Sequence, residues 1–170
     1  MKIWSKQEIT RFGAVTIWVT IALVVFLCNV SAQSIDEKRI QKVLTQNTTA
    51  FAQNDLATLD KIWAHDESVM VFENGHANYG WLDYRNNHLA PEMKEITNTK
   101  YTSSDMKVKV SGKTAWAIFK YAISGDSEGK HFDSGGLGTA ILEKRNGQWL
   151  IVHWHSSAPR RTPPSSPTPK

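Results

Sequence analysis

The chain has 170 residues, of which 41% are hydrophobic, so it can form one globular domain with a buried core. Its formal net charge is +4, but residues 1–32 contribute +2 and residues 158–170 contribute +3, which leaves −1 for residues 33–157. This charge distribution excludes an extended nucleic-acid-binding face on the domain.

Residues 1–32 have the pattern of a secretory signal peptide. Basic residues precede the apolar run 14–28, and Val30-Ser31-Ala32 supplies small residues before a cleavage position at Gln33. The run is shorter than the about 20 residues of a spanning helix, and an uncleaved membrane anchor is the alternative. The only cysteine, Cys28, would leave with the signal, and a mature chain without disulfides is ordinary in the periplasm. We expect a periplasmic or secreted bacterial protein.

The other end of the chain has a different composition. Residues 158–170 hold five of the six prolines and no large apolar side chain. Such a segment cannot bury enough apolar surface to offset the entropy lost on ordering, so the sequence predicts a disordered proline-rich tail. The single domain then spans residues 33–157.

The first half of the domain has helical periodicity and then a hairpin. Apolar residues at helical spacing predict an amphipathic helix over residues 35–53, and Asn54 or Asp55 can cap a short second helix. Residues 68–73 form a compact apolar strand that ends at Asn74-Gly75, a hairpin turn signal. The return strand of this hairpin is expected over residues 76–80.

A third helix and a run of strands follow. The helix is expected over residues 81–95, with an interruption or bend at Pro91. Alternating and apolar patterns then predict four strands, at residues 101–110, 114–124, 131–145 and 148–157. The fold class is α+β: a curved antiparallel sheet, with three helices in the N-terminal half that enclose a pocket on its concave side.

The last strand carries the first pair of candidate site residues. Because successive strand residues point to opposite faces, one face should carry Trp149, Ile151, His153 and His155, and the other Leu150, Val152, Trp154 and Ser156. Two imidazoles about 7 Å apart along a strand could bind a polar ligand, or one could act as a base near neutral pH. The alternative is a structural role, with both rings held by hydrogen bonds.

The third helix and the hairpin carry further candidates. A single helical stripe contains Trp81, Tyr84, Arg85 and His88. An aromatic wall with a guanidinium suits a planar, anionic or carbonyl-bearing ligand, whereas the alternative is ordinary packing with Arg85 paired to an acid such as Glu73. Glu73 itself could be a general base with a raised pKa, or a partner in an ion pair.

A metal site is a weaker hypothesis. Glu73, His88, His153 and His155 are chemically suited to a divalent ion, but no close spacing links them along the chain. The sequence also contains no glycine-rich phosphate loop and no nucleophile elbow. We therefore expect neither a metal nor a cofactor.

Four segments resemble a known superfamily: residues 50–56 (AFAQNDL), 71–73 (VFE), 80–85 (GWLDYR) and 147–156 (GQWLIVHWHS). Together with the order of elements, they resemble the nuclear transport factor 2-like superfamily, in its SnoaL-like and ketosteroid-isomerase-like branch. The Phe-Glu strand and the His-x-His strand ending are also similar to the association domain of calcium/calmodulin-dependent kinase II. The resemblance implies a cone-shaped domain, a pocket between the concave sheet and the helices, and dimers packed through the convex sheet face.

These patterns lead to one function hypothesis with two alternatives. We expect an exported pocket protein that binds a small organic molecule and forms a homodimer, with Leu150, Val152 and Trp154 on the dimer surface. One alternative is an enzyme that performs proton-transfer or hydrolytic chemistry with Glu73, His153 and His155. The other is a homo-oligomeric assembly module. The Asp base of the isomerase branch, with its Tyr and protonated-acid donors, matches no motif in this chain.

Overall fold

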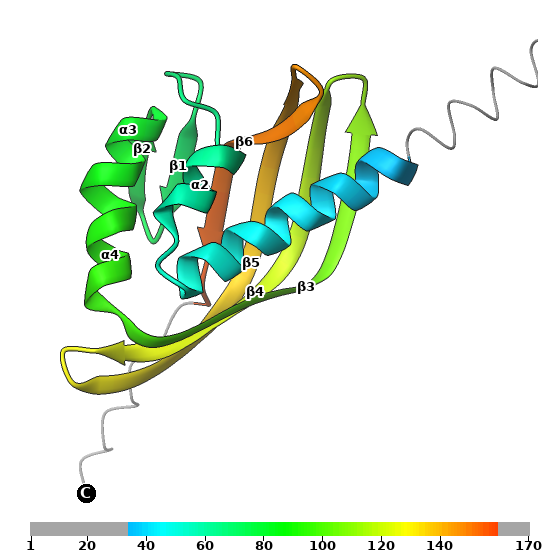
Figure 1. Cartoon of the computed structure of the whole chain (residues 1–170). Coiled ribbons are helices and arrows are strands. Elements are labelled where there is room, and N and C mark those ends of the chain that lie inside the picture. The colour runs from blue at the N-terminus through cyan, green and yellow to red at the C-terminus, as the bar shows by residue number, and fades with distance from the viewer. Residues whose placement is uncertain (1–33, 160–170) are drawn as a thin grey trace, which may run out of the picture. The chain divides into compact units, whose positions relative to one another are not determined.

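The computed structural model describes residues 34–159 of the chain (Figure 1). The chain divides into two units, Met1–Lys38 and Arg39–Lys170, and the architecture below is that of the second unit. The predicted signal peptide and residues 160–170 of the predicted tail lie outside the described residues. Within residues 34–159, no helix combines the length and apolar character needed to cross a membrane.

The elements appear in the predicted order. A helix covers residues 34–52. It is followed by α2 (Leu56–Ile62), β1 (Met70–Glu73), β2 (His76–Tyr79), α3 (Trp81–Tyr84), the π-helical segment η1 (Arg85–Leu89), α4 (Ala90–Glu95), β3 (Thr97–Ser111), β4 (Thr114–Ser127), β5 (Lys130–Arg145) and β6 (Gln148–Ser157). The long strands extend a few residues beyond the segments that the sequence patterns indicated.

The strands form one six-stranded sheet in the order β2-β1-β6-β5-β4-β3. The meander from β3 to β6 is antiparallel, as predicted, whereas β1 pairs with β6 in parallel, so the sheet is mixed. Two register shifts in β3 lie at Asn98 and Asp105, both with positive φ, and such bulges bend a strand. The curved sheet and the helices confirm the predicted α+β fold, and the helices lie over one face of the sheet (Figure 1).

Local sequence signals explain several boundaries. Asp55 caps α2, because its Oδ1 accepts a hydrogen bond from the backbone N–H of Thr58 at 3.0 Å. Asn74 and Gly75 both have positive φ, which is the geometry of a tight hairpin turn. The third helix is interrupted one turn before Pro91, because proline has no N–H to bond the carbonyl four residues earlier.

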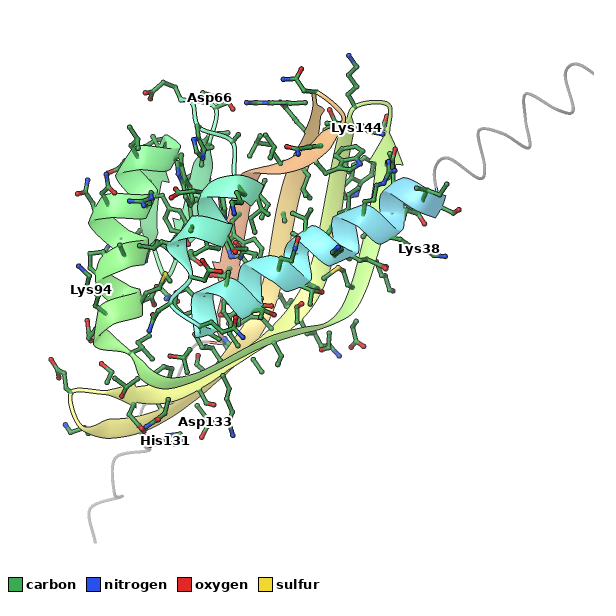
Figure 2. The ribbon with its side chains drawn as sticks, in the orientation of Figure 1. Lys38, Asp66, Lys94, His131, Asp133 and Lys144 are labelled. Atoms are coloured by element: carbon green, nitrogen blue, oxygen red, sulfur yellow. The ribbon has the colours of Figure 1, made fainter. Side chains whose placement is uncertain are left out.

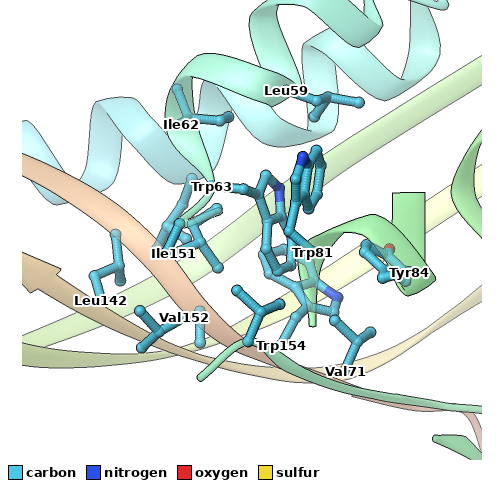
Figure 3. Packing of buried hydrophobic residues seen from close by; sticks show 14 of the residues in the cluster. Leu59, Ile62, Trp63, Val71, Trp81, Tyr84, Leu142, Ile151, Val152 and Trp154 are labelled. Atoms are coloured by element: carbon cyan, nitrogen blue, oxygen red, sulfur yellow. The ribbon is translucent and has the colours of Figure 1, made fainter. Parts of the chain in front are cut away.

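The core lies between the concave face of the sheet and the helices. Its largest fully buried side chains are Trp63, Trp81 and Trp154. The rings of Trp63 and Trp81 stack with centroids 5.2 Å apart (Figure 3). The Trp63 indole donates to Asn47 Oδ1 at 2.8 Å. Charged side chains such as Lys94 lie around the outside of the domain (Figure 2).

One extra residue in β6 changes which side chains face the core. Leu142 of β5 pairs with Ile151, but Ile141 pairs with His153, so Val152 forms a β-bulge. The predicted alternation is therefore wrong beyond Ile151, because a bulge shifts the pattern by one residue. Trp154 is buried on the concave side, and His153 lies on the convex face, the side turned away from the helices.

An ion pair joins α2 to the third helix. Asp60 accepts hydrogen bonds from Arg85 Nε at 2.7 Å and Arg85 Nη2 at 3.0 Å, and its Oδ1 also accepts from the Trp81 indole at 3.0 Å. The hydrogen bond from Arg85 is the main cause that lowers the pKa of Asp60, with the Trp81 bond acting in the same direction. This fork-like arrangement holds the third helix against α2.

We expect Asp60→Asn to lower the free energy of unfolding by about 1–3 kcal/mol, because the charge-assisted bonds are lost from a partly buried site. Chemical denaturation at neutral pH measures the change. The matched control is Asp105→Asn, which breaks a 2.7 Å ion pair with Lys120 on the exposed surface and should lower stability much less, because solvent screens the pair. Equal losses in the two variants would contradict a structural role for Asp60.

Candidate functional site

A cavity of about 290 Å³ lies between the concave face of the sheet and the helices. Its walls are largely aromatic, formed by Phe51, Tyr84, Tyr101, Tyr121, Phe132 and Trp154. Its polar side chains include Asn47, Glu73, His88, Glu92, Ser134 and Ser156. A partly apolar cavity with a few convergent polar groups is the usual form of a small-molecule site.

Glu73 lies at the centre of the polar groups. It is the last residue of β1, and the parallel ladder places it opposite Ser156 of β6. Ser156 Oγ donates to Glu73 Oε1 at 3.2 Å, and the Tyr84 hydroxyl donates to Oε2 at 3.1 Å. The carboxyl group is thus held by one donor from the sheet and one from the third helix.

His88 approaches Glu73 from the π-helical segment. Its Nδ1 lies 2.8 Å from Asn78 Oδ1, and Asn78 Nδ2 donates to Asp83 Oδ2 at 3.0 Å. Because this second bond orients the Asn78 amide, the Nδ1 of His88 carries a proton and donates it to Asn78. His88 Nε2 then faces two carboxylates, at 3.8 Å from Glu73 Oε2 and 3.9 Å from Glu92 Oε2.

The cavity perturbs the acid–base properties of its residues. Burial raises the pKa of Glu73, although His88 and the hydrogen bonds from Tyr84 and Ser156 act in the opposite direction. Burial, together with the negative charges of Glu73 and Glu95, raises the pKa of Glu92 to about 7. Both carboxyl groups can therefore take up or release a proton closer to neutrality than an exposed glutamate.

The tyrosines act as hydrogen-bond donors rather than acids. Burial, followed by the negative charge of Glu73, raises the pKa of both Tyr84 and Tyr101 well above the usual value for a phenol. Their hydroxyl groups consequently stay protonated at neutral pH. The arrangement can hold a polar group of a ligand against Glu73, or exchange a proton with it.

Three of the residues predicted from the sequence line this cavity together: Glu73, Tyr84 and His88. The other two members of the predicted helical stripe do not. Trp81 is buried in the core, 1% exposed, and Arg85 is paired with Asp60 rather than with Glu73. Only two residues of the predicted stripe, Tyr84 and His88, therefore line the cavity. The Arg85 guanidinium, which suggested an anionic ligand, does not.

The two strand histidines lie on the convex face, with the ring of Phe72 beside them. The ring centroids of His153 and His155 are 5.5 and 6.5 Å from that of Phe72. Burial is the main cause that lowers the pKa of His153, and its Nδ1 has no hydrogen-bond partner among the described residues. The structure does not bring these imidazoles together with Glu73, because the Val152 bulge turns them to the opposite side of the sheet.

Sequence reasoning missed several cavity residues. Glu92 lies four residues after His88, a helical spacing that could have indicated it. Tyr101 and Tyr121 carry no such signal, because their convergence depends on the pairing of β3 with β4 and on the curvature of the sheet. The predicted alternation assigned Ser156, like Trp154, to the wrong face of the sheet, because it did not include the bulge at Val152.

No group of three or more His, Asp or Glu side chains within residues 34–159 is arranged to hold a metal ion.

Comparison with known proteins identifies the fold. A family model described as a SnoaL-like domain matches residues 40–161. A nuclear transport factor 2-like superfamily protein from Salmonella enterica serovar Typhimurium has a similar structure, with a TM-score of 0.70 and 17% identity over 79% of this chain and 99% of the other. No curated protein sequence matches this chain.

Two further solved structures agree with the predicted resemblance. A ketosteroid isomerase-like protein from Shewanella frigidimarina is 25% identical over 68% of this chain and 92% of its own, with a TM-score of 0.61. The association domain of a C. elegans calcium/calmodulin-dependent kinase II is 18% identical over 74% of this chain and 98% of its own, with a TM-score of 0.60. The predicted relationship to the superfamily is confirmed.

We expect Glu92→Gln to raise the melting temperature near pH 8 but not below about pH 4.5. The raised pKa of Glu92 means that the folded state binds a proton more tightly than the unfolded state, whose value is near 4.5. Stability is therefore lost as pH rises towards 7, and glutamine, which does not titrate, avoids this loss.

Thermal unfolding of the variant and the wild type at both pH values measures the difference. Glu128→Gln, in the turn between β4 and β5, is the control for removal of one negative charge. A melting-temperature difference that is the same at both pH values would contradict the raised pKa of Glu92.

Proposed function

We propose that this protein, which belongs to the SnoaL-like domain family, binds a small organic molecule in the cavity between the concave sheet and the helices. The observation that carries the proposal is the convergence of Glu73, Tyr84, His88 and Ser156 inside an aromatic cavity. The signal pattern of residues 1–32 supports export as part of the same proposal.

The cavity restricts the size of the ligand. Its volume of about 290 Å³ is at the lower end of the about 300–1,000 Å³ of typical ligand pockets. The aromatic walls can cover an apolar ring or chain, while Glu73 and the hydroxyl groups orient a polar substituent. A single-ring compound with one polar group fits this description better than an extended or strongly charged anion.

The binding proposal predicts that some members of a library of small aromatic and alicyclic compounds raise the melting temperature by several degrees. Binding at a concentration about 100 times the Kd stabilises a folded protein by about 2.7 kcal/mol. Ser134→Trp should abolish the shift, because Ser134 lines the cavity and an indole there fills it.

The matched control is Ser124→Trp on the paired strand. Ser124 lies opposite Asp133, one residue out of phase with Ser134, and therefore points to the convex side. This variant should keep the ligand-induced shift. The proposal is wrong if no compound stabilises the protein, or if both tryptophan variants bind as the wild type does.

We propose in addition that the protein forms a homodimer through the convex face. Two of the three residues predicted for this surface are not available to it, since Trp154 is 2% exposed and faces the cavity, and Val152 is also buried. Only Leu150 of the three predicted residues is partly exposed. Large exposed apolar side chains on the convex face are found instead on β4 and β5, at Trp116, Ile118 and Leu137.

The strand registers place Trp116 and Ile118 in two neighbouring rows across the sheet, whereas Leu137 lies opposite Lys120 in the row that follows them. One row contains Lys109, Trp116, Ile141, His153, Met70 and Tyr79, and the next contains Lys107, Ile118, Thr139, His155, Phe72 and Ala77. The rows combine the exposed apolar side chains of Trp116, Ile118, Met70 and Tyr79 with polar ones, and exposed apolar groups that gather on one face often mark a protein interface. The similarity to a kinase association domain supports self-association as its use.

The dimer proposal predicts that light scattering finds a dimer for the wild type and a monomer for Ile118→Lys. Ile118 is half exposed, so lysine should leave the folded subunit intact while placing a charge in the apolar interface. Leu82→Lys is the control, because Leu82 is 68% exposed on α3 and lies outside the convex face. A monomeric wild type, or equal dissociation of both variants, would overturn this interface.

A further inference from the structure

We propose that the ligand of the cavity is a small organic cation, an ammonium ion with an apolar substituent, which Glu73 and Glu92 hold while the aromatic walls cover its apolar part. The inference rests on the proposed ligand-binding function and specifies its chemical class. It follows from the charge of the cavity, the nature of its walls and the hydrogen-bonding capacity that its residues leave unused.

The ionisable side chains of the cavity favour a positive ligand. Among residues 34–159, Glu73 and Glu92 line it, and neither lysine nor arginine does. Of these described lining residues, His88 alone can carry a positive charge, and it lies within 4 Å of an oxygen of each carboxylate. With both glutamates ionised, the lining has a net negative charge even when His88 is protonated.

The nearest arginine does not change this balance. Arg85 is on the same helical segment as His88, but both its Nε and its Nη2 donate to Asp60. The guanidinium is thus neutralised by a carboxylate outside the cavity lining. An anionic ligand would meet two acidic groups with only His88 to offset them, which is unfavourable in a cavity of low dielectric.

The aromatic walls also favour a cation. The ring centroids of Phe51 and Tyr101 are 5.5 Å apart with an interplanar angle of 85°, and those of Tyr101 and Tyr121 are 6.1 Å apart at 75°. Because neighbouring rings are almost perpendicular, the aromatic faces that border the cavity have several orientations. Ring faces attract ammonium groups, and aromatic enclosures with nearby carboxylates recognise organic cations.

Some hydrogen-bonding capacity in the cavity is unused. The Tyr101 hydroxyl belongs to a side chain that lines the cavity. Tyr84 and Ser156 donate to different oxygens of Glu73, and a bond from the Trp154 side chain also lowers its pKa, whereas the two carboxylate oxygens can accept about four hydrogen bonds in all. An ammonium N–H group can donate to Glu73, and an ammonium ion fits this combination of acceptors.

Binding of a cation should depend on pH, because the carboxyl groups of the cavity must be ionised to hold it. The groups that face Glu92 are Glu73 on β1, and His88 and Glu95 on the same helical segment. A bound cation favours the ionised carboxylates, so binding should release protons near neutral pH. Below about pH 7 protonation of Glu92 should weaken binding of the cation.

Isothermal titration calorimetry with three probes of one shape tests the charge requirement. Benzylamine is cationic at neutral pH, benzyl alcohol is neutral and benzoate is anionic, while all three share the same ring. At pH 8 we expect benzylammonium to bind at least about tenfold more tightly than benzyl alcohol, as a charge-assisted hydrogen bond implies, and benzoate to bind least. Lowering the pH to about 6 should weaken the binding of benzylammonium.

Variants assign this selectivity to the carboxylates. Glu73→Gln should reduce the preference for benzylammonium over benzyl alcohol by about tenfold or more, while the neutral probe still binds. Glu92→Gln tests the same preference for benzylammonium if Glu73→Gln fails to fold. It should also remove most of the pH dependence of benzylammonium binding. Glu128→Gln, the charge control outside the cavity, should change neither the preference for benzylammonium nor the pH dependence of its binding.

The outcomes separate this inference from the broader binding proposal. If benzyl alcohol or benzoate binds as tightly as benzylammonium, the cation inference is overturned while the cavity still binds a small molecule. If no probe binds but neutral library compounds stabilise the protein, the inference is also overturned. If benzylammonium binds equally well to Ser134→Trp, its site is elsewhere and the inference fails.

Discussion

The cavity depends on the parallel ladder between β1 and β6. This ladder places Val71 beside Trp154 and Glu73 beside Ser156, so that an apolar pair is followed by a polar pair along the concave face. The Val152 bulge is necessary for the arrangement, because without it the side chains after Ile151 would point the other way. One backbone irregularity therefore supplies both the aromatic wall of Trp154 and the hydroxyl that holds Glu73.

The third helix completes the site from the other side. Its π-helical segment ends just before Pro91 and carries His88, and Asp83 and Asn78 orient the imidazole. The Asp60–Arg85 pair anchors the same segment against α2. A buried carboxylate normally lowers stability unless donors or a charge compensate it, and only part of that compensation is present around Glu73. Incomplete compensation of this kind is typical of functional sites, where binding of a ligand supplies the remainder.

The two faces of the sheet have separate properties. The concave face is closed by helices and contains the acidic, aromatic cavity, whereas the convex face exposes Trp116 and Ile118 together with the strand histidines. Because the two faces meet only through the backbone, the proposed ligand binding and the proposed self-association should be separable by substitution. In the proposed dimer, His153 would lie at the interface rather than in the cavity.

The sequence alone determined the elements that depend on local chemistry. Helical periodicity, the Asp55 cap and the Asn74-Gly75 turn depend on residues close together in the chain, and each was predicted at or near its observed position. The site residues Glu73, Tyr84 and His88 could also be predicted from the sequence. Glu73 lies at the end of a strand, and Tyr84 and His88 lie on one stripe of the following helix.

Only the tertiary structure decided which side chains meet. The bulge at Val152, the parallel partner of β1 and the convergence of Tyr101 with Tyr121 all depend on pairing between distant segments. A single inserted residue reverses the direction of every later side chain in a strand, and no local pattern in β6 marks that residue. For this reason the sequence identified the strand that borders the cavity, whereas the structure decided that Trp154 and Ser156, rather than the two histidines, face into it.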